Sequence, residues 1–314
     1  MFVALTLLVL DRLARALPAA WLYALARLAG SVAPPIAERR RQTVRANLQI
    51  LRPEWSPRRL DKATTRVFQE SCAYYVDMAR LAGMTPRAAL AQLDVEGLEL
   101  LREAHAAGRG VVVAGAHVGN AEFVVRALPA VGLECAALVE PLPEGPRMRA
   151  MEALRRAPSG GGGLRTMPAT VGGIKEAVRY LRDGGILAVL ADRDIQGGGS
   201  CVPFRGRQAR FPHGAVDLAL RTGAALLFCL TPRAAGPARG DRFRVQFMAT
   251  EPLLRSDNSG LDVRVNVANL VRLMEPHLAH HADQWRLFES PWAPCRDSAY
   301  IDPTGHGRPA EAPS

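Results

Sequence analysis

Residues 110–126, GVVVAGAHVGNAEFVVR, hold an imidazole and a carboxylate five positions apart, at His117 and Glu122. An imidazole can take a proton from a hydroxyl near neutral pH if its other ring nitrogen is held in the right tautomer. A carboxylate can hold that nitrogen and stabilise the imidazolium that forms. We therefore expect His117 to act as a general base that Glu122 orients.

The residues around His117 predict where this pair lies. The β-branched apolar run 111–113 is typical of a strand buried on both faces, and helical spacing begins after Gly119-Asn120. His117 should stand where a strand ends and a helix begins, with Glu122 about one turn into the helix. Ligands bind at this edge of open α/β sheets. The alternative is a chance histidine near a loop with a surface glutamate.

Two further segments have the composition of buried parallel strands, and each ends in a charged residue. Residues 133–139 are followed by Glu140, and residues 186–191 are followed by Asp192-Arg193. Helical spacing predicts connecting helices, among them 146–157. Strands that alternate with helices favour an α/β fold with a central, mostly parallel sheet flanked by helices.

The carboxyl ends of parallel strands lie at one edge of the sheet. This rule brings together His117, Glu140 and Asp192, with Glu122 and Arg155 on the helices that follow. The result is one base, several carboxylates and an arginine beside a pocket edge. Acyl transfer from a thioester to an alcohol needs such groups, because a base must remove the proton of the attacking hydroxyl. We expect no metal and no cofactor.

The segment HVGNAE after GVVVAGA resembles the His-x4-acid motif of the bacterial glycerolipid acyltransferases. It is most like the branch of lipid A biosynthesis acyltransferases and mycobacterial phosphatidylinositol mannoside acyltransferases, which commonly reads His-aromatic-Gly-Asn-Trp-Glu/Asp. This chain keeps the histidine, glycine, asparagine and acid and differs at the two aromatic positions, Val118 and Ala121. Dispersed motifs extend the resemblance over most of residues 36–292. They include Phe204, Gly206, Pro212, Gly214 and Gln284-Trp285 before Trp292.

This resemblance implies an O-acyltransferase that moves a fatty acyl chain from acyl-CoA or acyl-carrier protein to a hydroxyl of a lipid or glycolipid. The acceptor would be like a lipid A precursor or a phosphatidylinositol mannoside. The resemblance further implies that Glu140 and Arg155 bind the acceptor head group or complete the site, with Asp192 near the head group. Asn120 and Arg193 join the expected substrate-binding residues.

The amino-acid composition limits the classes of molecule that the protein could bind. The 314 residues are 48% hydrophobic and carry a net charge of +10, with Lys62 and Lys175 as the only lysines. Arginine pairs bidentately with phosphates, so an anionic membrane, a phosphorylated substrate or a nucleic acid could provide the counter-charge. The chain lacks nucleic-acid-binding signatures and is 6% aromatic, which argues against a nucleic-acid partner. The five cysteines lie far apart and suggest reduced thiols in a cytosolic setting.

Residues 1–35 form a very apolar segment that ends at Pro34-Pro35 and is interrupted by Asp11, Arg12 and Arg15. These charges argue against a spanning helix, and the features of a signal peptide are missing. We expect one or two helices in the interface of an anionic leaflet, the alternative being a core helix. The predicted location is the cytoplasmic face of the plasma (inner) membrane, peripheral or monotopic. Residues 36–296 would form the acyltransferase domain and residues 297–314 a disordered tail.

Two other functions remain open at this point. A thioester hydrolase would pass the acyl group to water and need no lipid acceptor. A non-catalytic membrane-surface protein would retain the fold without the reaction, although the His117 and Glu122 pair argues against it.

Overall fold

The structure is a computed structural model that describes residues 17–141, 145–156, 164–195, 197–234 and 242–292. The first half of the predicted apolar segment and the predicted tail lie outside the described residues.

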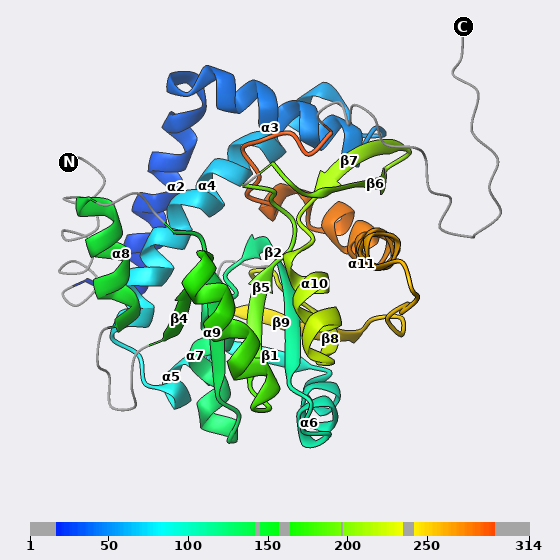
Figure 1. The fold of residues 1–314 in the computed structure, drawn as a ribbon. Helices are drawn as coiled ribbons and strands as arrows, with labels where there is room; N and C mark the ends of the chain where they lie inside the picture. The colour runs from blue at the N-terminus through cyan, green and yellow to red at the C-terminus, as the bar shows by residue number, and fades with distance from the viewer. Residues whose placement is uncertain (1–16, 142–144, 157–163, 196, 235–241, 293–314) are drawn as a thin grey trace, which may run out of the picture.

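A seven-stranded sheet forms the centre of the molecule, in the order β1-β9-β8-β2-β5-β3-β4 (Figure 1). From β8 to β4 the strands run parallel, whereas β9 is antiparallel to β8 and pairs in parallel with β1. The predicted α/β class with a mostly parallel sheet is confirmed. The strands of this sheet are β1 (Leu93–Glu96), β2 (Val111–Gly119), β3 (Cys135–Val139), β4 (Arg165–Pro168), β5 (Ile186–Leu190), β8 (Ala225–Thr231) and β9 (Phe243–Ala249).

Helices flank the sheet, and a separate hairpin of β6 (Ser200–Phe204) and β7 (Arg207–Phe211) packs on α11 (Figure 1). The described helices are α2 (Ala19–Ile36), α3 (Glu38–Leu51), α4 (Pro57–Ala82), α5 (Pro86–Leu90), α6 (Leu98–Ala106), α7 (Glu122–Ala127), α8 (Pro146–Arg156), α9 (Val171–Arg182), α10 (Gly214–Thr222) and α11 (Ser259–His280), with the 3-10 turns η1 (Leu128–Val131) and η3 (Ala282–Gln284).

Strand β2 is buried on both faces, as its β-branched run predicts. Side chains alternate along a strand. Val112 and Ala114 therefore join the core with α9, α10 and α11, whereas Val111 and Val113 join the core with α5, α6 and α7. A strand covered on both sides has no freedom to shift register, because a one-residue slip would exchange the two cores. The residues at its carboxyl end are thereby fixed in place.

Helix α2 packs along α4, and the two lie side by side in Figure 1. At Gly30 a Cβ would overlap the backbone of Gln69, so only glycine allows this approach. The Tyr23 hydroxyl donates to Asp77 at 2.6 Å, and Asp77 also pairs with the buried Arg233 at 2.6 Å. Breaking the Asp77–Arg233 pair would leave an uncompensated buried charge, so the pair holds α4 to the segment after β8, and the Tyr23 hydrogen bond attaches α2 to the same carboxylate.

Three details of the fold differ from, or add to, the sequence predictions. Pro34 and Pro35 lie within the last turn of α2, which ends at Ile36 rather than before them. Cys201 is disulfide-bonded, so the expectation of reduced thiols is wrong at this position. In the described ranges, no helix combines the length and apolar character needed to cross a bilayer.

Candidate active site

Asp192 is the carboxylate that meets His117. Strands β2 and β5 are neighbours, with Gly115 opposite Leu190. His117 and Asp192 each lie two residues beyond this last pair, so the register of the two strands brings them together. The backbone N–H of His117 donates to Asp192 Oδ2 at 2.8 Å, and the His117 ring nitrogen Nδ1 lies 2.7 Å from Asp192 Oδ1.

The electrostatics of this pair suit a base held by an ionised carboxylate. The side chain of Asp192 is 0% exposed and that of His117 is 22% exposed. Burial alone would raise the pKa of Asp192, but attraction to His117 and the hydrogen bonds from His117 and Trp285 outweigh burial and hold the pKa below its ordinary value of 3.8. The ionised carboxylate accepts the Nδ1 proton, which leaves Nε2 as the nitrogen able to take a proton.

The expected contact between Glu122 and His117 is wrong. Glu122 is the first residue of α7 rather than one turn inside it. In the described part of the chain, its carboxylate is held by Arg155, at 2.9 Å from Nη2, and by the Tyr74 hydroxyl at 3.0 Å. Five positions along one chain do not bring Glu122 back to the ring, whereas the adjacent strand β5 delivers Asp192 in register.

Glu122 and Arg155 form a partly buried ion pair next to α4. Burial would lower the pKa of Arg155, but the neighbouring Glu122 carboxylate raises it above its ordinary value. Burial and the same carboxylate raise the pKa of Tyr74. The pair therefore presents a charged guanidinium and a carboxylate that share hydrogen bonds with a neutral phenol.

A second ion pair lies after the ends of β3 and β5. Arg193 Nη1 lies 3.3 Å from Glu140 Oε2, and its Nη2 lies 2.8 Å from Glu289 Oε1. The structure thus joins two of the predicted substrate-binding residues, Glu140 and Arg193, and adds Glu289 from the carboxyl-terminal segment. All three side chains are partly exposed, so this group can still contact a ligand.

The turn between β2 and α7 depends on Gly119 and Asn120. Gly119 has a φ of +60°, and a Cβ there would overlap the Thr231 carbonyl oxygen. Asn120 is buried and its side-chain oxygen accepts from the Glu122 backbone N–H at 3.0 Å. Asn120 therefore shapes the start of α7.

Sequence reasoning missed the roles of Trp285 and Arg286, which follow η3. The Arg286 backbone N–H donates to the His117 carbonyl at 2.9 Å, and its guanidinium donates to the Gly119 carbonyl at 3.0 Å. The indole of Trp285 donates to Asp192 Oδ2 at 2.8 Å. The Gln-Trp motif was visible in the sequence, but nothing in it indicated which strand the motif would meet.

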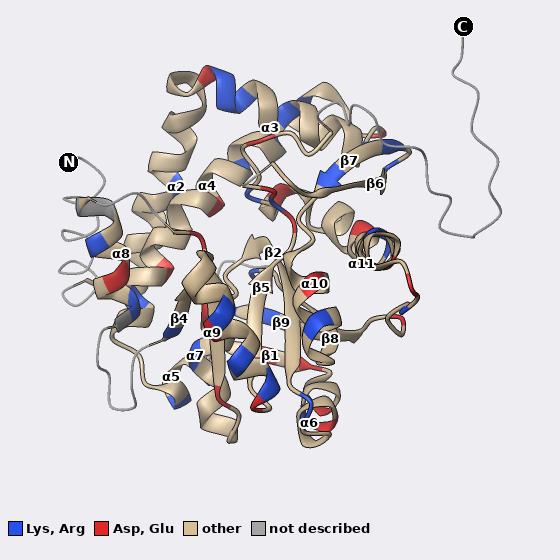
Figure 2. Ribbon diagram, viewed as in Figure 1, with Lys and Arg blue, Asp and Glu red and all other residues tan. Residues whose placement is uncertain are grey.

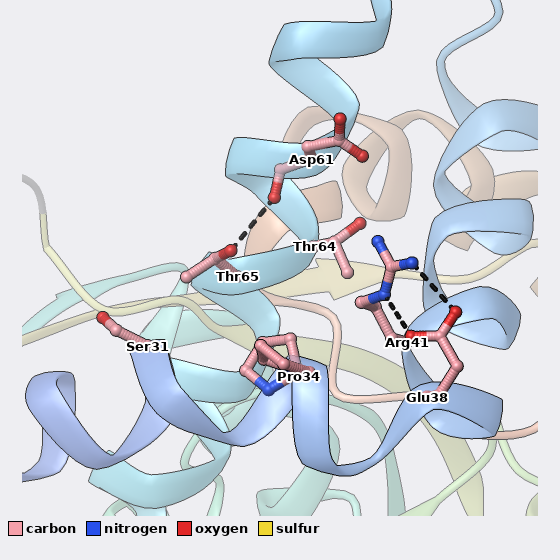
Figure 3. A pocket seen from close by; sticks show the side chains of 8 residues that line it. Ser31, Pro34, Glu38, Arg41, Asp61, Thr64 and Thr65 are labelled. Carbon is pink, nitrogen blue, oxygen red and sulfur yellow. Dashed lines mark hydrogen bonds and ion pairs between the residues drawn. The ribbon is translucent and has the colours of Figure 1, made fainter.

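A hollow of about 340 Å³ lies where α2, α3 and α4 meet (Figure 3). Its side chains engage one another or the backbone: Arg41 pairs with Glu38, and Thr65 donates to the Asp61 carbonyl. None of its lining residues belongs to the groups around His117. Among the described residues, no three His, Cys, Asp or Glu side chains gather as a metal ion would require.

Comparison with known proteins finds acyltransferases, both among the curated relatives and in the matching family model. A phosphatidylinositol mannoside acyltransferase of Mycobacterium tuberculosis (strain CDC 1551 / Oshkosh) is 28% identical over 225 residues, which cover 70% of this chain and 66% of the relative, just under two thirds of its length. One of Mycolicibacterium smegmatis is 28% identical over 223 residues, covering 70% of this chain and 68% of the relative. The family model described as bacterial lipid A biosynthesis acyltransferase matches residues 2–293. The chain therefore belongs to the bacterial lipid A biosynthesis acyltransferase family.

Proposed function

We propose that this protein is an O-acyltransferase that moves a fatty acyl chain from an acyl thioester to a hydroxyl of a lipid or glycolipid. The observation that carries this proposal is the His117–Asp192 pair. A buried, ionised carboxylate fixes Nδ1, while the partly exposed ring keeps Nε2 available for an incoming hydroxyl. Membership of the acyltransferase family supports the same reaction.

The reaction follows from these groups. His117 Nε2 takes the proton of the acceptor hydroxyl as its oxygen attacks the thioester carbonyl carbon. The tetrahedral intermediate then collapses, the carbon–sulfur bond breaks, and the leaving sulfur takes the proton back from the imidazolium. Asp192 stabilises the imidazolium between these two steps. The products are an ester and a free thiol.

The two ion pairs that follow the ends of β2, β3 and β5 are the proposed acceptor site. Glu122 with Arg155, and Glu140 with Arg193, offer carboxylates that accept from sugar hydroxyls and guanidinium groups that pair with phosphate. Asn120 supports the first pair by holding the start of α7. An acceptor with both a phosphate and a sugar fits this set, and the mannoside acyltransferase relatives favour a phosphoinositol-type glycolipid over a lipid A precursor.

The donor is acyl-CoA or acyl-carrier protein, and no cofactor takes part. Both donors present the acyl group as a thioester of phosphopantetheine. The arginine-rich surface of the chain provides the counter-charge for either donor.

A purified-enzyme assay tests the proposed reaction. The protein is incubated with palmitoyl-CoA and vesicles that contain phosphatidylinositol mannoside, and both thiol release and lipid mass are followed. We expect thiol release to depend on the acceptor and to match the gain of one acyl chain per lipid. Thiol release that is undiminished without any lipid acceptor would identify a thioesterase instead. No turnover with palmitoyl-CoA, palmitoyl-carrier protein, mannoside or lipid A precursor would leave only the non-catalytic alternative.

The outer face of α2 is the proposed membrane contact. Its exposed large apolar residues recur every three or four positions, the spacing of one helix face. Trp21 is 67% exposed and Ile36 is 81% exposed. Arg39 and Arg40 follow at once on the exposed start of α3 (Figure 2), where they can pair with lipid phosphates. The face consists of Trp21, Leu25, Leu28, Val32 and Ile36.

Replacing Trp21, Leu25 and Leu28 together with serine is expected to weaken binding to phosphatidylglycerol-containing vesicles by at least about tenfold, because each side chain loses apolar area that the lipid would cover. Co-sedimentation at fixed lipid measures the change. Val171, which is exposed and apolar on α9, provides the matched control as Val171→Ser. Equal binding by the triple variant and the control would exclude α2 as the contact. With such a contact, the protein would lie at the cytoplasmic face of the inner membrane.

A further inference from the structure

Trp285 completes the set of donors around the carboxylate of Asp192. Its indole Nε1 donates to Oδ2 at 2.8 Å, and the backbone N–H of His117 donates to the same oxygen at 2.8 Å. The other oxygen, Oδ1, lies 2.7 Å from His117 Nδ1. With Oδ2 held by two donors, the carboxylate cannot rotate without losing both, so Oδ1 stays directed at the imidazole.

The surroundings leave little room for another donor to replace the indole. Trp285 is 3% exposed and the Asp192 side chain is fully buried. The indole packs edge-on against Phe204 and Trp292, and Val118 forms an isolated bridge with Trp285. Because both groups are buried, solvent does not replace the indole N–H as a donor to Asp192 Oδ2. Removing the indole would therefore cost the full free energy of that hydrogen bond.

We propose that Trp285 is a positioning residue of the acyl-transfer site, acting through Asp192 on the orientation and charge balance of His117. The inference rests on the proposed function, because it assigns Trp285 a part in the step that His117 performs. A purely structural role is the alternative, since a buried indole also needs a partner for its own N–H.

Trp292 offers a matched comparison within the same aromatic cluster. Its ring lies 6.3 Å from that of Trp285 and stacks on Phe204 at 5.3 Å between centroids. Its Nε1 also makes one hydrogen bond, but to the Phe204 carbonyl at 3.1 Å. The two tryptophans therefore differ in what the indole N–H holds: the carboxylate in one case and a backbone carbonyl in the other.

The kinetic test compares Trp285→Phe with Trp292→Phe. We expect Trp285→Phe to lower kcat by about tenfold to a hundredfold, the worth of one hydrogen bond to a charged group, with little change in the KM of the acceptor. The pH at which kcat/KM falls to half on the acid side should rise by about half a unit, because a less neutralised carboxylate holds the imidazolium more strongly. Trp292→Phe should keep the original pH profile.

A second variant preserves the shape of the ring. Benzothienylalanine at position 285 has the outline of tryptophan with sulfur in place of the N–H, so it tests the hydrogen bond even if Trp285→Phe folds poorly. The same loss and the same pH shift are expected. Activity and a pH profile equal to those of the unchanged protein would overturn the proposal, as would an equal loss in Trp285→Phe and Trp292→Phe without a pH shift.

A spectroscopic measurement separates this inference from the proposed function. With nitrogen-15-labelled histidine, the Nδ1 proton of His117 is assigned by its disappearance in His117→Gln. Its resonance should move downfield in Trp285→Phe and stay in place in Trp292→Phe, because Oδ1 becomes a stronger acceptor when Oδ2 loses a donor. An unmoved resonance would overturn the positioning role. This reading requires no turnover, so it stands even if the acyl-transfer assay fails.

Discussion

Replacing His117 with glutamine is expected to lower kcat for acyl transfer by about 10²–10⁴-fold, the contribution typical of a positioned general base. Glutamine keeps a polar side chain of similar reach but cannot take up the proton of the acceptor hydroxyl. The acceptor KM should change little, because the ion pairs that we assign to head-group binding, Glu122–Arg155 and Glu140–Arg193, are left intact. Single-turnover formation of the acylated lipid, followed by mass spectrometry, measures the loss.

His280→Gln is the matched control, since this imidazole is exposed at the end of α11. It should retain the rate of the unchanged protein. Equal thermal melting curves for His117→Gln and His280→Gln would show that the loss is chemical. Near-normal turnover by a folded His117→Gln would remove His117 from the reaction and with it the assignment of the base.

Replacing Asp192 with asparagine is expected to cost about as much, on the order of 10²–10⁴-fold in kcat. The amide has nearly the shape of the carboxylate but no charge to stabilise an imidazolium, and its NH2 group can turn towards Nδ1 and favour the wrong tautomer. The pKa of Asp192 is held below its ordinary value of 3.8. The carboxylate therefore stays ionised throughout the range in which an imidazole changes charge, and the cost should be present at every pH near neutrality.

Two comparisons make the Asp192 prediction specific. Asp194→Asn alters a neighbouring carboxylate that accepts from the backbone N–H groups of Gly197 and Gly199, away from the His117 ring, and should leave kcat close to normal. Glu122→Gln should act mainly on the acceptor KM, because Glu122 is bound to Arg155 and Tyr74. A larger fall in kcat for Glu122→Gln than for Asp192→Asn would reverse the two assignments.

The sequence by itself determined the buried central strand, two further parallel strands of the same sheet and the sheet edge at which the candidate residues lie. The β-branched run before His117 predicted a doubly buried strand, which is β2. Ser56 and Pro57 are a cap and first-turn pair, and α4 begins there with the Ser56 side chain accepting from the Arg59 N–H. These features depend on neighbours a few positions away, so short windows of sequence contain the information. The rule that parallel strands end at one edge then placed Asp192 where the structure pairs it with His117, and Glu140 where the structure pairs it with Arg193.

Only the tertiary structure decided which carboxylate holds the imidazole. Spacing along the chain favoured Glu122, but the register of β2 and β5 set Asp192 against Nδ1 from 75 residues away in sequence. Trp285 arrives from 93 residues beyond Asp192. A hydrogen-bond partner is chosen by strand order and register, which follow from how the whole core packs. The sequence therefore supplied the candidate groups, and the packed sheet selected the pair among them.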